Sequence, residues 1–281
     1  RVINKYDFEV EVIATKYKGH AINIVKELDE VDLVMSFGGD GTFNEVMRGN
    51  FLRKKRLLLS HIPVGTTNDV GAMFGYGKNI IKNVEDTLKG EIKEMDICTI
   101  NGVPFIYVAG FGKYMDISYD TPGKIKKRFG YLAYLKEGIK EFFSKTKMYD
   151  ITYEINGEEY RGLFSLIIVS SANHIAGISN IYKDVKLDDD KFEVLFCTIK
   201  KKKDLLKSLY FLTKYDFSNV PGLYFYRTSK LKITINNKDK KSFCIDGEKL
   251  DDDSVLFSIK NINGIKVLLP KKNIEKLFIN S

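Results

Sequence analysis

The sequence predicts an α/β domain with a parallel sheet, followed by an antiparallel β domain with helical insertions. Three observations support this fold class. In the first part of the chain, short apolar runs alternate with segments of helical periodicity. After about Glu94 most apolar runs have strand patterns, and Asn-Gly pairs occur among them. A chain of 281 residues is also longer than one compact core usually is, so two domains are expected.

The first part of the chain supplies the elements of a parallel sheet in order. Residues 8–13 alternate in strand fashion, and residues 16–30 place their apolar side chains on one helical face. Residues 31–37 have the pattern of a strand buried on both faces, a second helical pattern follows residue 41, and residues 57–62 predict another buried strand. Because strands and helices alternate, we expect right-handed crossovers and helices on both faces of the sheet.

The second part of the chain is predicted to be mainly antiparallel. Its segments with strand patterns are 103–109, 150–155, 163–170, 191–198, 224–235, 242–246, 254–260 and 264–269. Asn156-Gly157 and Asn263-Gly264 are hairpin signals. Helices are expected over residues 124–145 and 202–216. Since no low-complexity linker separates the two parts, we expect docked domains with a cleft between them.

Composition limits the classes of function. The formal net charge is +8, from 45 Lys plus Arg against 37 Asp plus Glu, which favours polyanions or an acidic membrane surface as partners. No apolar run approaches the ~20 residues of a membrane-spanning helix. Aromatic residues are not interleaved with base-reading motifs, which argues against nucleic acid as a partner. The three cysteines lie far apart in apolar stretches, which indicates buried thiols in a reducing cytoplasm.

A glycine-rich loop is the strongest functional signal. Gly38-Gly39-Asp40-Gly41-Thr42 lies between a buried strand and a helix N-terminus, where backbone amides can approach phosphate and the helix dipole favours an anion. Thr42 can donate its hydroxyl to phosphate, and Asp40 is a carboxylate suited to Mg²⁺. The alternative is a plain strand–helix turn with a threonine cap. Because the loop lacks a P-loop lysine and dinucleotide-type glycine spacing, amides, hydroxyls and metal must hold the phosphate.

A second segment, Pro63-Val64-Gly65-Thr66-Thr67-Asn68-Asp69, repeats this arrangement after the next strand. Loops at the carboxyl ends of neighbouring parallel strands meet at one crevice. We therefore expect Asp40 and Asp69 to face the same ligand, with Thr66 as a further phosphate donor. Taken alone, the segment is as readily an Asn-Asp helix cap, but together with the first loop it predicts a nucleotide site.

A carboxylate pair, Asp246 and Glu248, follows the strand-like residues 241–245. In an extended segment, residues i and i+2 point to one side, and Gly247 allows close backbone approach. Two carboxylates on one face can bind Mg²⁺, or one of them can accept a proton from an attacking hydroxyl. Without the nucleotide loops, an acidic turn that closes a hairpin would be the better interpretation.

Together these motifs resemble the diacylglycerol kinase catalytic family, which includes bacterial lipid kinases, sphingosine kinases and ceramide kinases. The resemblance rests on Gly38-Gly39-Asp40-Gly41-Thr42 with Asn44-Glu45-Val46, on Pro63-Val64-Gly65-Thr66 with Asn68-Asp69, and on residues 127–135, 186–189 and 246–248. It implies a three-layer N-terminal α/β domain related to NAD kinase and phosphofructokinase, and a C-terminal antiparallel β-sandwich. It also implies ATP as the phosphoryl donor, Mg²⁺ as cofactor and a lipid alcohol as acceptor.

The resemblance assigns roles to individual residues. It implies Glu248 as the proton acceptor with Asp246 as its neighbour, and Asp40 as a metal-linked carboxylate of the catalytic site. The nucleotide-binding residues that it implies are Thr15, Gly38, Gly39, Asp40, Gly41, Thr42, Phe43, Asn44, Glu45, Gly65, Thr66, Asn68, Asp69 and Asp96. Considered alone, Asp96 is as readily part of a turn or an interdomain hydrogen bond.

A second, structural Mg²⁺ site is implied in the turn of residues 186–191. In the bacterial branch the ligands correspond to Asp189 and the main-chain oxygens of Lys186 and Lys191. The family usually has glycine where this chain has Asp190. A solvated hairpin turn is the alternative interpretation.

The resemblance also divides the chain. Residues 1–95 are expected to form the nucleotide-binding α/β domain and residues 96–265 the β-rich lipid-substrate domain, with the tail 266–281 returning to the first. The family opens with a strand that ends in an Asn-Pro loop, and Arg1 lies beyond it. We therefore expect that a preceding segment is missing from this sequence.

The sequence thus predicts an ATP- and Mg²⁺-dependent kinase that phosphorylates the hydroxyl of diacylglycerol or a related lipid alcohol. We expect a cytoplasmic protein. The basic amphipathic residues 124–147 are explained most simply as a core-packing helix with a solvated basic face, and peripheral docking of this region on an anionic membrane is the alternative hypothesis. Exposed sheet edges would support a homodimer. Two alternatives stay open. One is a kinase of a soluble metabolite or nucleotide, like NAD kinase, and the other is a catalytically silent lipid- or nucleotide-binding protein.

Overall fold

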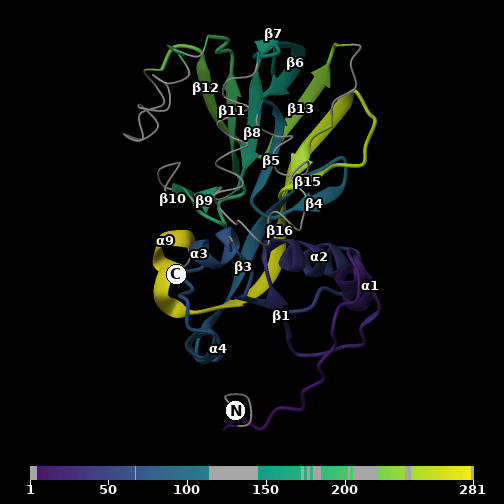
Figure 1. Cartoon of the computed structure of the whole chain (residues 1–281), viewed down its shortest axis with the longest axis vertical. Helices are drawn as coiled ribbons and strands as arrows, with labels where there is room; N and C mark the ends of the chain where they lie inside the picture. The colour runs from purple at the N-terminus through teal and green to yellow at the C-terminus, as the bar shows by residue number, and fades with distance from the viewer. Residues whose placement is uncertain are drawn as a thin grey trace.

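Two large β-sheets organise the computed structural model of the protein (Figure 1). The structure describes residues 5–66, 68–113, 145–171, 174–175, 178–179, 185–201, 203–204, 220–237 and 242–279. The helices are α1 (His20–Glu27), α2 (Asp40–Phe51), α3 (Asp69–Met73), α4 (Ile80–Leu88), the 3-10 helix η2 (Lys271–Asn273) and α9 (Ile274–Leu277). The strands are β1 (Val34–Gly38), β2 (Leu59–Pro63), β3 (Glu91–Ile100), β4 (Val103–Phe105), β5 (Val108–Gly112), β6 (Tyr149–Ile155), β7 (Glu158–Phe164), β8 (Leu166–Ser170), β9 (His174–Ile175), β10 (Ile178–Ser179), β11 (Phe192–Cys197), β12 (Leu223–Thr228), β13 (Lys230–Ile235), β14 (Cys244–Ile245), β15 (Glu248–Lys249) and β16 (Leu256–Leu269).

The first sheet, sheet A, contains strands from both parts of the chain. Its order is β1-β2-β16-β13-β6-β7, with β3 paired to β16 and β4 paired to β3. β1 and β2 are parallel, and β16 continues the parallel arrangement where Val267 pairs with Leu59. α1 and α2 lie to one side of these strands, and α3, α4 and α9 lie to the other (Figure 1). The predicted parallel strands with helices on both faces are confirmed.

The second sheet, sheet B, is antiparallel, with the order β12-β11-β8-β5-β14-β15. It packs against β6, β7 and β13 of sheet A across an aromatic core. Tyr153 of β6 stacks on Phe196 of β11 with ring centroids 4.0 Å apart, and Phe111 of β5 meets Tyr149 edge-on. The predicted class, an α/β part joined to an antiparallel β-sandwich, is confirmed.

β3 and β16 form a long antiparallel ribbon that serves both halves of the molecule. β16 spans 14 residues; its first part pairs with β13, and its last part lies beside β2. Ile100 and Ile259 of the ribbon belong to the core between the sheets, whereas Ile97 and Val267 belong to the core beneath the helices. The predicted domain limits therefore fall inside continuous strands, and the division into domains stays a prediction.

Three apolar runs that the sequence predicts as single strands are each two strands in the structure. These runs are 103–109, 163–170 and 224–235. In each run one strand belongs to sheet A and the other to sheet B, so the chain crosses between the sheets in the middle. Since both strands face the same apolar core, hydrophobicity continues across the crossing and the pattern does not reveal it.

The predicted strand over residues 8–13 is wrong. These residues are exposed, and no strand in the described part of the chain pairs with them. A strand needs a neighbouring ladder of hydrogen bonds, which the alternation of apolar and charged side chains cannot replace. The helix predicted over 16–30 is present but shorter, as α1.

Asn-Gly pairs have two different structures in this chain. Asn156-Gly157 forms the predicted hairpin turn, with φ of 53° and 85° between β6 and β7. Asn101-Gly102, which was not among the predicted hairpin signals, forms the same turn between β3 and β4. Asn263-Gly264 is not a hairpin, because β16 continues through it and only the pairing with β3 shifts. Gly264, with φ of 84°, forms part of this β-bulge.

The predicted helices 124–145 and 202–216 lie almost wholly outside the described residues, as does the basic region 124–147. Within the part of the chain that the structure describes, no helix is long and apolar enough to cross a bilayer. Cys98, Cys197 and Cys244 are buried thiols, as the sequence predicts.

Candidate active site

The two glycine loops lie against each other at the carboxyl ends of β1 and β2. Gly38 is in register with Pro63, and the Gly38 carbonyl accepts the N–H of Val64 at 2.8 Å. A Cβ atom added to Gly65 would lie 2.5 Å from the Cα of Gly39, so the backbones touch there. The parallel pairing of the two strands brings these loops together.

Asp40 connects the loops through its carboxylate. One oxygen accepts the N–H of Asp69 at 2.9 Å and the other accepts the N–H of Val70 at 3.0 Å, which caps the first turn of α3. The left-handed Asn68, with φ of 55°, secures the second loop because its side-chain oxygen accepts the N–H of Gly65 at 2.8 Å. The structure therefore brings Asp40 and Asp69 together, and it orients both from the starts of helices.

The first turn of α2 combines close packing with an open backbone. The N–H of Thr42 donates to the Gly39 carbonyl at 3.0 Å. A Cβ atom on Gly38 would lie 2.5 Å from the Cβ of Thr42, so only glycine leaves room for this side chain. At Gly41 no atom lies within 4 Å of such a Cβ, and the residue is exposed. This turn of backbone is accessible to an anionic ligand.

Tyr107 lies in the crossing between β4 and β5, where its backbone N–H donates to the Asp246 carboxylate at 3.1 Å. Burial raises the pKa of Tyr107 well above its ordinary value, and the nearby charges of Asp246, Asp40 and Asp69 raise it further. The hydrogen bond from the Asn44 side chain to Asp246 joins the hairpin of β14 and β15 to α2, which follows the first glycine loop. Sequence reasoning missed Tyr107, because it lies within an apolar run that resembles a plain strand.

Asp246 and Glu248 do not lie on one face of an extended segment. Asp246 and Gly247 have φ of 47° and 84° and form the turn between β14 and β15, in which Ile245 pairs with Glu248. The prediction of an extended segment is wrong, because this turn reverses the chain between the two carboxylates. The alternative interpretation, an acidic turn that closes a hairpin, describes the geometry.

Asp246 is buried, and four groups donate hydrogen bonds to its carboxylate. They are the backbone N–H groups of Ile106, Tyr107 and Val108 and the side-chain amide of Asn44. Burial raises the pKa of Asp246, and these hydrogen bonds oppose the rise because they favour the charged form. With its acceptor positions occupied, Asp246 is suited to fixing the hairpin rather than to taking a proton.

Glu248 is the accessible carboxylate of this hairpin. Its side chain is 38% exposed, and its Oε1 lies 2.9 Å from the Nζ of Lys18. Lys18 lies just before α1, whose first turn is capped by Glu45: the Glu45 carboxylate accepts the N–H of Gly19 at 2.8 Å. Sequence reasoning assigned Glu45 to the nucleotide and missed Lys18, since the segment before α1 carries no signal that it approaches the hairpin.

Other residues assigned to the nucleotide site lie in different surroundings. Phe43 is fully buried and stacks on His61 with ring centroids 4.8 Å apart, so its side chain belongs to the core. Thr66 is exposed on the second loop, next to the Gly65 backbone. Thr15 is exposed in the segment before α1, outside any helix or strand.

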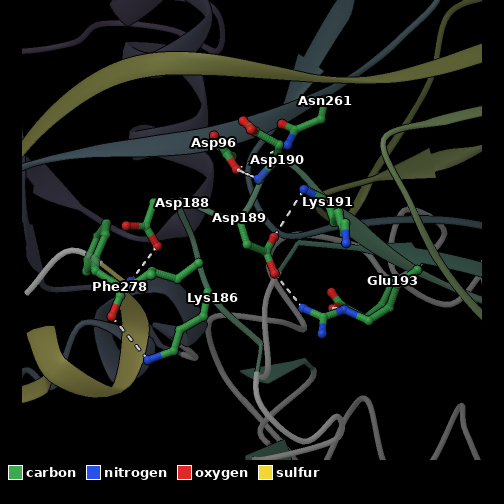
Figure 2. A network of polar contacts seen from close by, with 11 residues as sticks. Asp96, Lys186, Asp188, Asp189, Asp190, Lys191, Glu193, Asn261 and Phe278 are labelled. Carbon is green, nitrogen blue, oxygen red and sulfur yellow. Dashed lines mark hydrogen bonds and ion pairs between the residues drawn. The ribbon is translucent and has the colours of Figure 1, made fainter.

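Asp96 belongs to a second cluster, around the turn of residues 186–191, which Figure 2 shows. Its Oδ2 accepts the N–H of Asp190 at 2.7 Å and the side-chain amide of Asn261 at 3.1 Å. Burial raises the pKa of Asp96, and these two hydrogen bonds lower it. The prediction grouped Asp96 with the carboxylates of the glycine loops, whereas these contacts tie it to the turn.

The predicted metal ligand Asp189 already has a cationic partner. Its carboxylate pairs with Arg227 and accepts the N–H of Lys191 at 3.1 Å, and Arg227 also contacts the buried Glu193 at 3.1 Å. The Asp189 carboxylate therefore already serves an ion pair and a backbone N–H, and the structural Mg²⁺ site at this turn stays a prediction. Among the described residues, no group of three or more His, Cys, Asp or Glu side chains has the arrangement of a metal site.

Asp190 nevertheless adopts the turn conformation that glycine favours. Its φ is 61°, in the left-handed region, and its carboxylate accepts a hydrogen bond from the side chain of Asn263. Lys186 is turned away from the acidic residues, since its Nζ donates to the carbonyl of Phe278 at 3.1 Å (Figure 2). The turn is held by hydrogen bonds and by the Arg227 ion pair.

Known proteins share both the sequence and the fold. Residues 1–100 match the diacylglycerol kinase catalytic domain family. The chain is 29% identical to a diacylglycerol kinase of Bacillus subtilis over 254 residues, 88% of this chain and 83% of that protein. It is 29% identical to a diacylglycerol kinase of Staphylococcus saprophyticus over 248 residues, 88% of this chain and 80% of that protein. A crystal structure of a diacylglycerol kinase from Bacillus anthracis has the same fold, with a TM-score of 0.70 at 20% identity, over 92% of this chain and 85% of that one.

Proposed function

We propose that this chain, a kinase of the diacylglycerol kinase-like family, transfers the γ-phosphoryl group of ATP to the hydroxyl of diacylglycerol or a related lipid alcohol, with Mg²⁺. The observation that carries the proposal is the contact of the two glycine loops through Asp40, with the Asp246–Glu248 hairpin joined to α2 by the hydrogen bond between Asn44 and Asp246. Phosphoryl transfer depends mainly on positioning and on neutralising charge, and both need groups fixed by a rigid scaffold.

Phosphate binding is assigned to the backbone of the glycine loops. Gly41, an exposed residue, lies in the first turn of α2, a helix of 12 residues whose dipole favours an anion at this end. Thr66 offers a hydroxyl from the second loop. Asp40 and Asp69 are hard oxygen donors that suit Mg²⁺, which neutralises phosphate charge when it is bound.

Activation of the acceptor hydroxyl is assigned to Glu248. An alcohol loses its proton as the phosphoryl group is transferred, so a carboxylate must lie within hydrogen-bond reach of it. Glu248 is half-exposed, whereas the donors around Asp246 leave that carboxylate little capacity to accept a proton. Asp246 holds the turn in place, and Glu248 takes the proton.

Transfer of labelled γ-phosphate from ATP to a panel of lipid alcohols in anionic micelles tests the proposal. We expect a Mg²⁺-dependent phospholipid product, and the best acceptor identifies the substrate. Glu248→Gln should lower kcat by about 10²–10⁴-fold, because it removes the general base, and should leave ATP binding unchanged. A labelled soluble metabolite in place of lipid, or ATP binding without any product, would contradict the lipid kinase.

The lipid acceptor would be reached at a membrane surface. The net charge of +8 supports electrostatic attraction to anionic headgroups, which weakens as salt is added. Co-sedimentation with vesicles of anionic phospholipid should therefore decrease with ionic strength, while vesicles of neutral phospholipid should bind weakly at every salt concentration.

A further inference from the structure

We infer that Lys18 is a positioning residue for Glu248. We also infer that α2 fixes the position of Lys18 relative to Glu248. The inference rests on the proposed function, in which Glu248 accepts the proton of the lipid hydroxyl. Its starting point is the 2.9 Å contact between the Nζ of Lys18 and the Oε1 of Glu248, which joins the segment before α1 to the hairpin of β14 and β15.

Two consecutive residues of α2 hold the two ends of this contact. The carboxylate of Glu45 accepts the N–H groups of Gly19 and Ala21, at 2.8 and 3.2 Å, and so anchors the chain directly after Lys18. Asn44 donates to Asp246, which opens the turn that leads to Glu248. Figure 1 shows α1 and α2 side by side, below the label of β15.

The chain is shaped to bring Lys18 to this place. Gly19 has φ of 84°, a left-handed conformation, and turns the backbone between Lys18 and the first turn of α1. A Cβ atom at Gly19 would meet no atom within 4 Å, so the glycine is explained by its conformation and not by crowding. A side chain of another residue at this position would strain the turn that carries Lys18.

The ion pair orients Glu248 more than it stabilises the fold. Lys18 is 75% exposed and Glu248 is 38% exposed, and exposed ion pairs contribute little to the free energy of unfolding. Orientation matters far more for a general base, because a misplacement of about 1 Å can cost on the order of 10²-fold in rate. β15 has only two residues, so the backbone alone leaves the long Glu248 side chain free to rotate. Lys18 selects one orientation.

Kinetics of Lys18→Met and Lys18→Arg test the inference in the full protein, with diacylglycerol as acceptor. Lys18→Met keeps the apolar stem and removes the charge, so kcat should fall about tenfold while KM for ATP and for lipid stays within about twofold. Lys18→Arg keeps a cation at this position, so its kcat should be close to that of the wild type. The melting temperature should not change in either variant, as expected for an exposed pair.

Lys55→Met is the matched control. Lys55 pairs with Glu30 at 2.8 Å, with side chains 74% and 71% exposed, and it takes no part in the proposed site. Its kinetics should equal those of the wild type. Wild-type turnover in Lys18→Met, or a loss of rate that Lys18→Arg does not recover, would overturn the inference while the lipid kinase stands. A wild-type protein that phosphorylates no lipid would overturn the proposed function, and the inference with it.

Discussion

At the scale of single residues, the hydrogen bond between Asn44 and Asp246 joins α2 to the hairpin of sheet B. Both side chains are buried, at 6% and 7% exposure, so neither can exchange its partner for water. A buried carboxylate that loses a donor keeps the full cost of its desolvation. This bond therefore couples the glycine loop to the carboxylate motif far along the chain.

Asn44→Ala should lower the free energy of unfolding by about 2 kcal/mol, since it leaves Asp246 with fewer donors. Urea denaturation measures the change. Asn236→Ala is the control, because Asn236 also donates to a carboxylate, that of Asp150 at 3.3 Å, but on the surface. The control should unfold like the wild type, and equal midpoints for the two variants would contradict the coupling.

Residue types could be predicted from the sequence more readily than residue contacts. The glycine loops indicate Asp40 and Asp69 because loop position follows from strand order. The partners of Asp246 and Glu45 could not be foreseen, because they come from segments that only the folded chain brings near. Phe43 shows the same limit: its place in the glycine motif suggests a ligand contact, whereas its neighbours in space make it a core residue.

At the scale of elements, the contact between the two glycine loops depends on glycine at residue 65. A Cβ there would lie 2.5 Å from the Cα of Gly39, and backbone cannot move aside as a flexible side chain can. Gly65→Ala should force the loops apart and weaken ATP binding about tenfold or more, measured by calorimetry. At Gly77 an added Cβ meets no atom within 4 Å, so Gly77→Ala should bind ATP normally. Normal binding by Gly65→Ala would contradict the assignment of phosphate to these loops.

The strand predictions are wrong where the same local sequence pattern is compatible with two different structures. An apolar strand pattern predicts that a segment is extended, and it does so correctly for the alternating β6 and for β11, which is buried throughout, but it does not identify the sheet. Residues 224–235 therefore look like one strand although β12 and β13 lie in different sheets. Asn-Gly favours left-handed backbone in both a hairpin turn and a bulge. Only the pairing partner, β3, shows that Asn263-Gly264 is a bulge.

At the scale of the whole molecule, two buried groups, His61 of β2 and Glu193 of β11, change the free energy of unfolding in opposite directions as the pH changes. Burial lowers the pKa of His61 from 6.5 to about 4, so its contribution to stability is complete above pH 6.5 and is lost as the pH falls toward 4. Burial raises the pKa of Glu193 from 4.5 to about 7, against the attraction of Arg227. Its contribution is complete below pH 4.5 and is lost as the pH rises through 7. Each amounts to about 3 kcal/mol at most.

Between pH 4.5 and 6.5 these contributions oppose each other, which single substitutions should reveal. In His61→Phe the free energy of unfolding should decrease as the pH rises, relative to the wild type. In Glu193→Gln it should increase by a similar amount, about 1 kcal/mol per pH unit. Urea midpoints at several pH values measure both slopes. Slopes that match the wild type in either variant would show that the substituted group does not titrate as assigned.

The ribbon of β3 and β16 also determines when the molecule can finish folding. A ribosome releases the chain from its N-terminus, yet β16 is the last described strand and supplies Ile259 to one core and Val267 to the other. Until β16 has emerged, β2 and β13 both lack a pairing partner, because each of them pairs with β16. Neither of the two hydrophobic cores can be completed before β16 is available. Both cores are therefore completed late, and by the same strand.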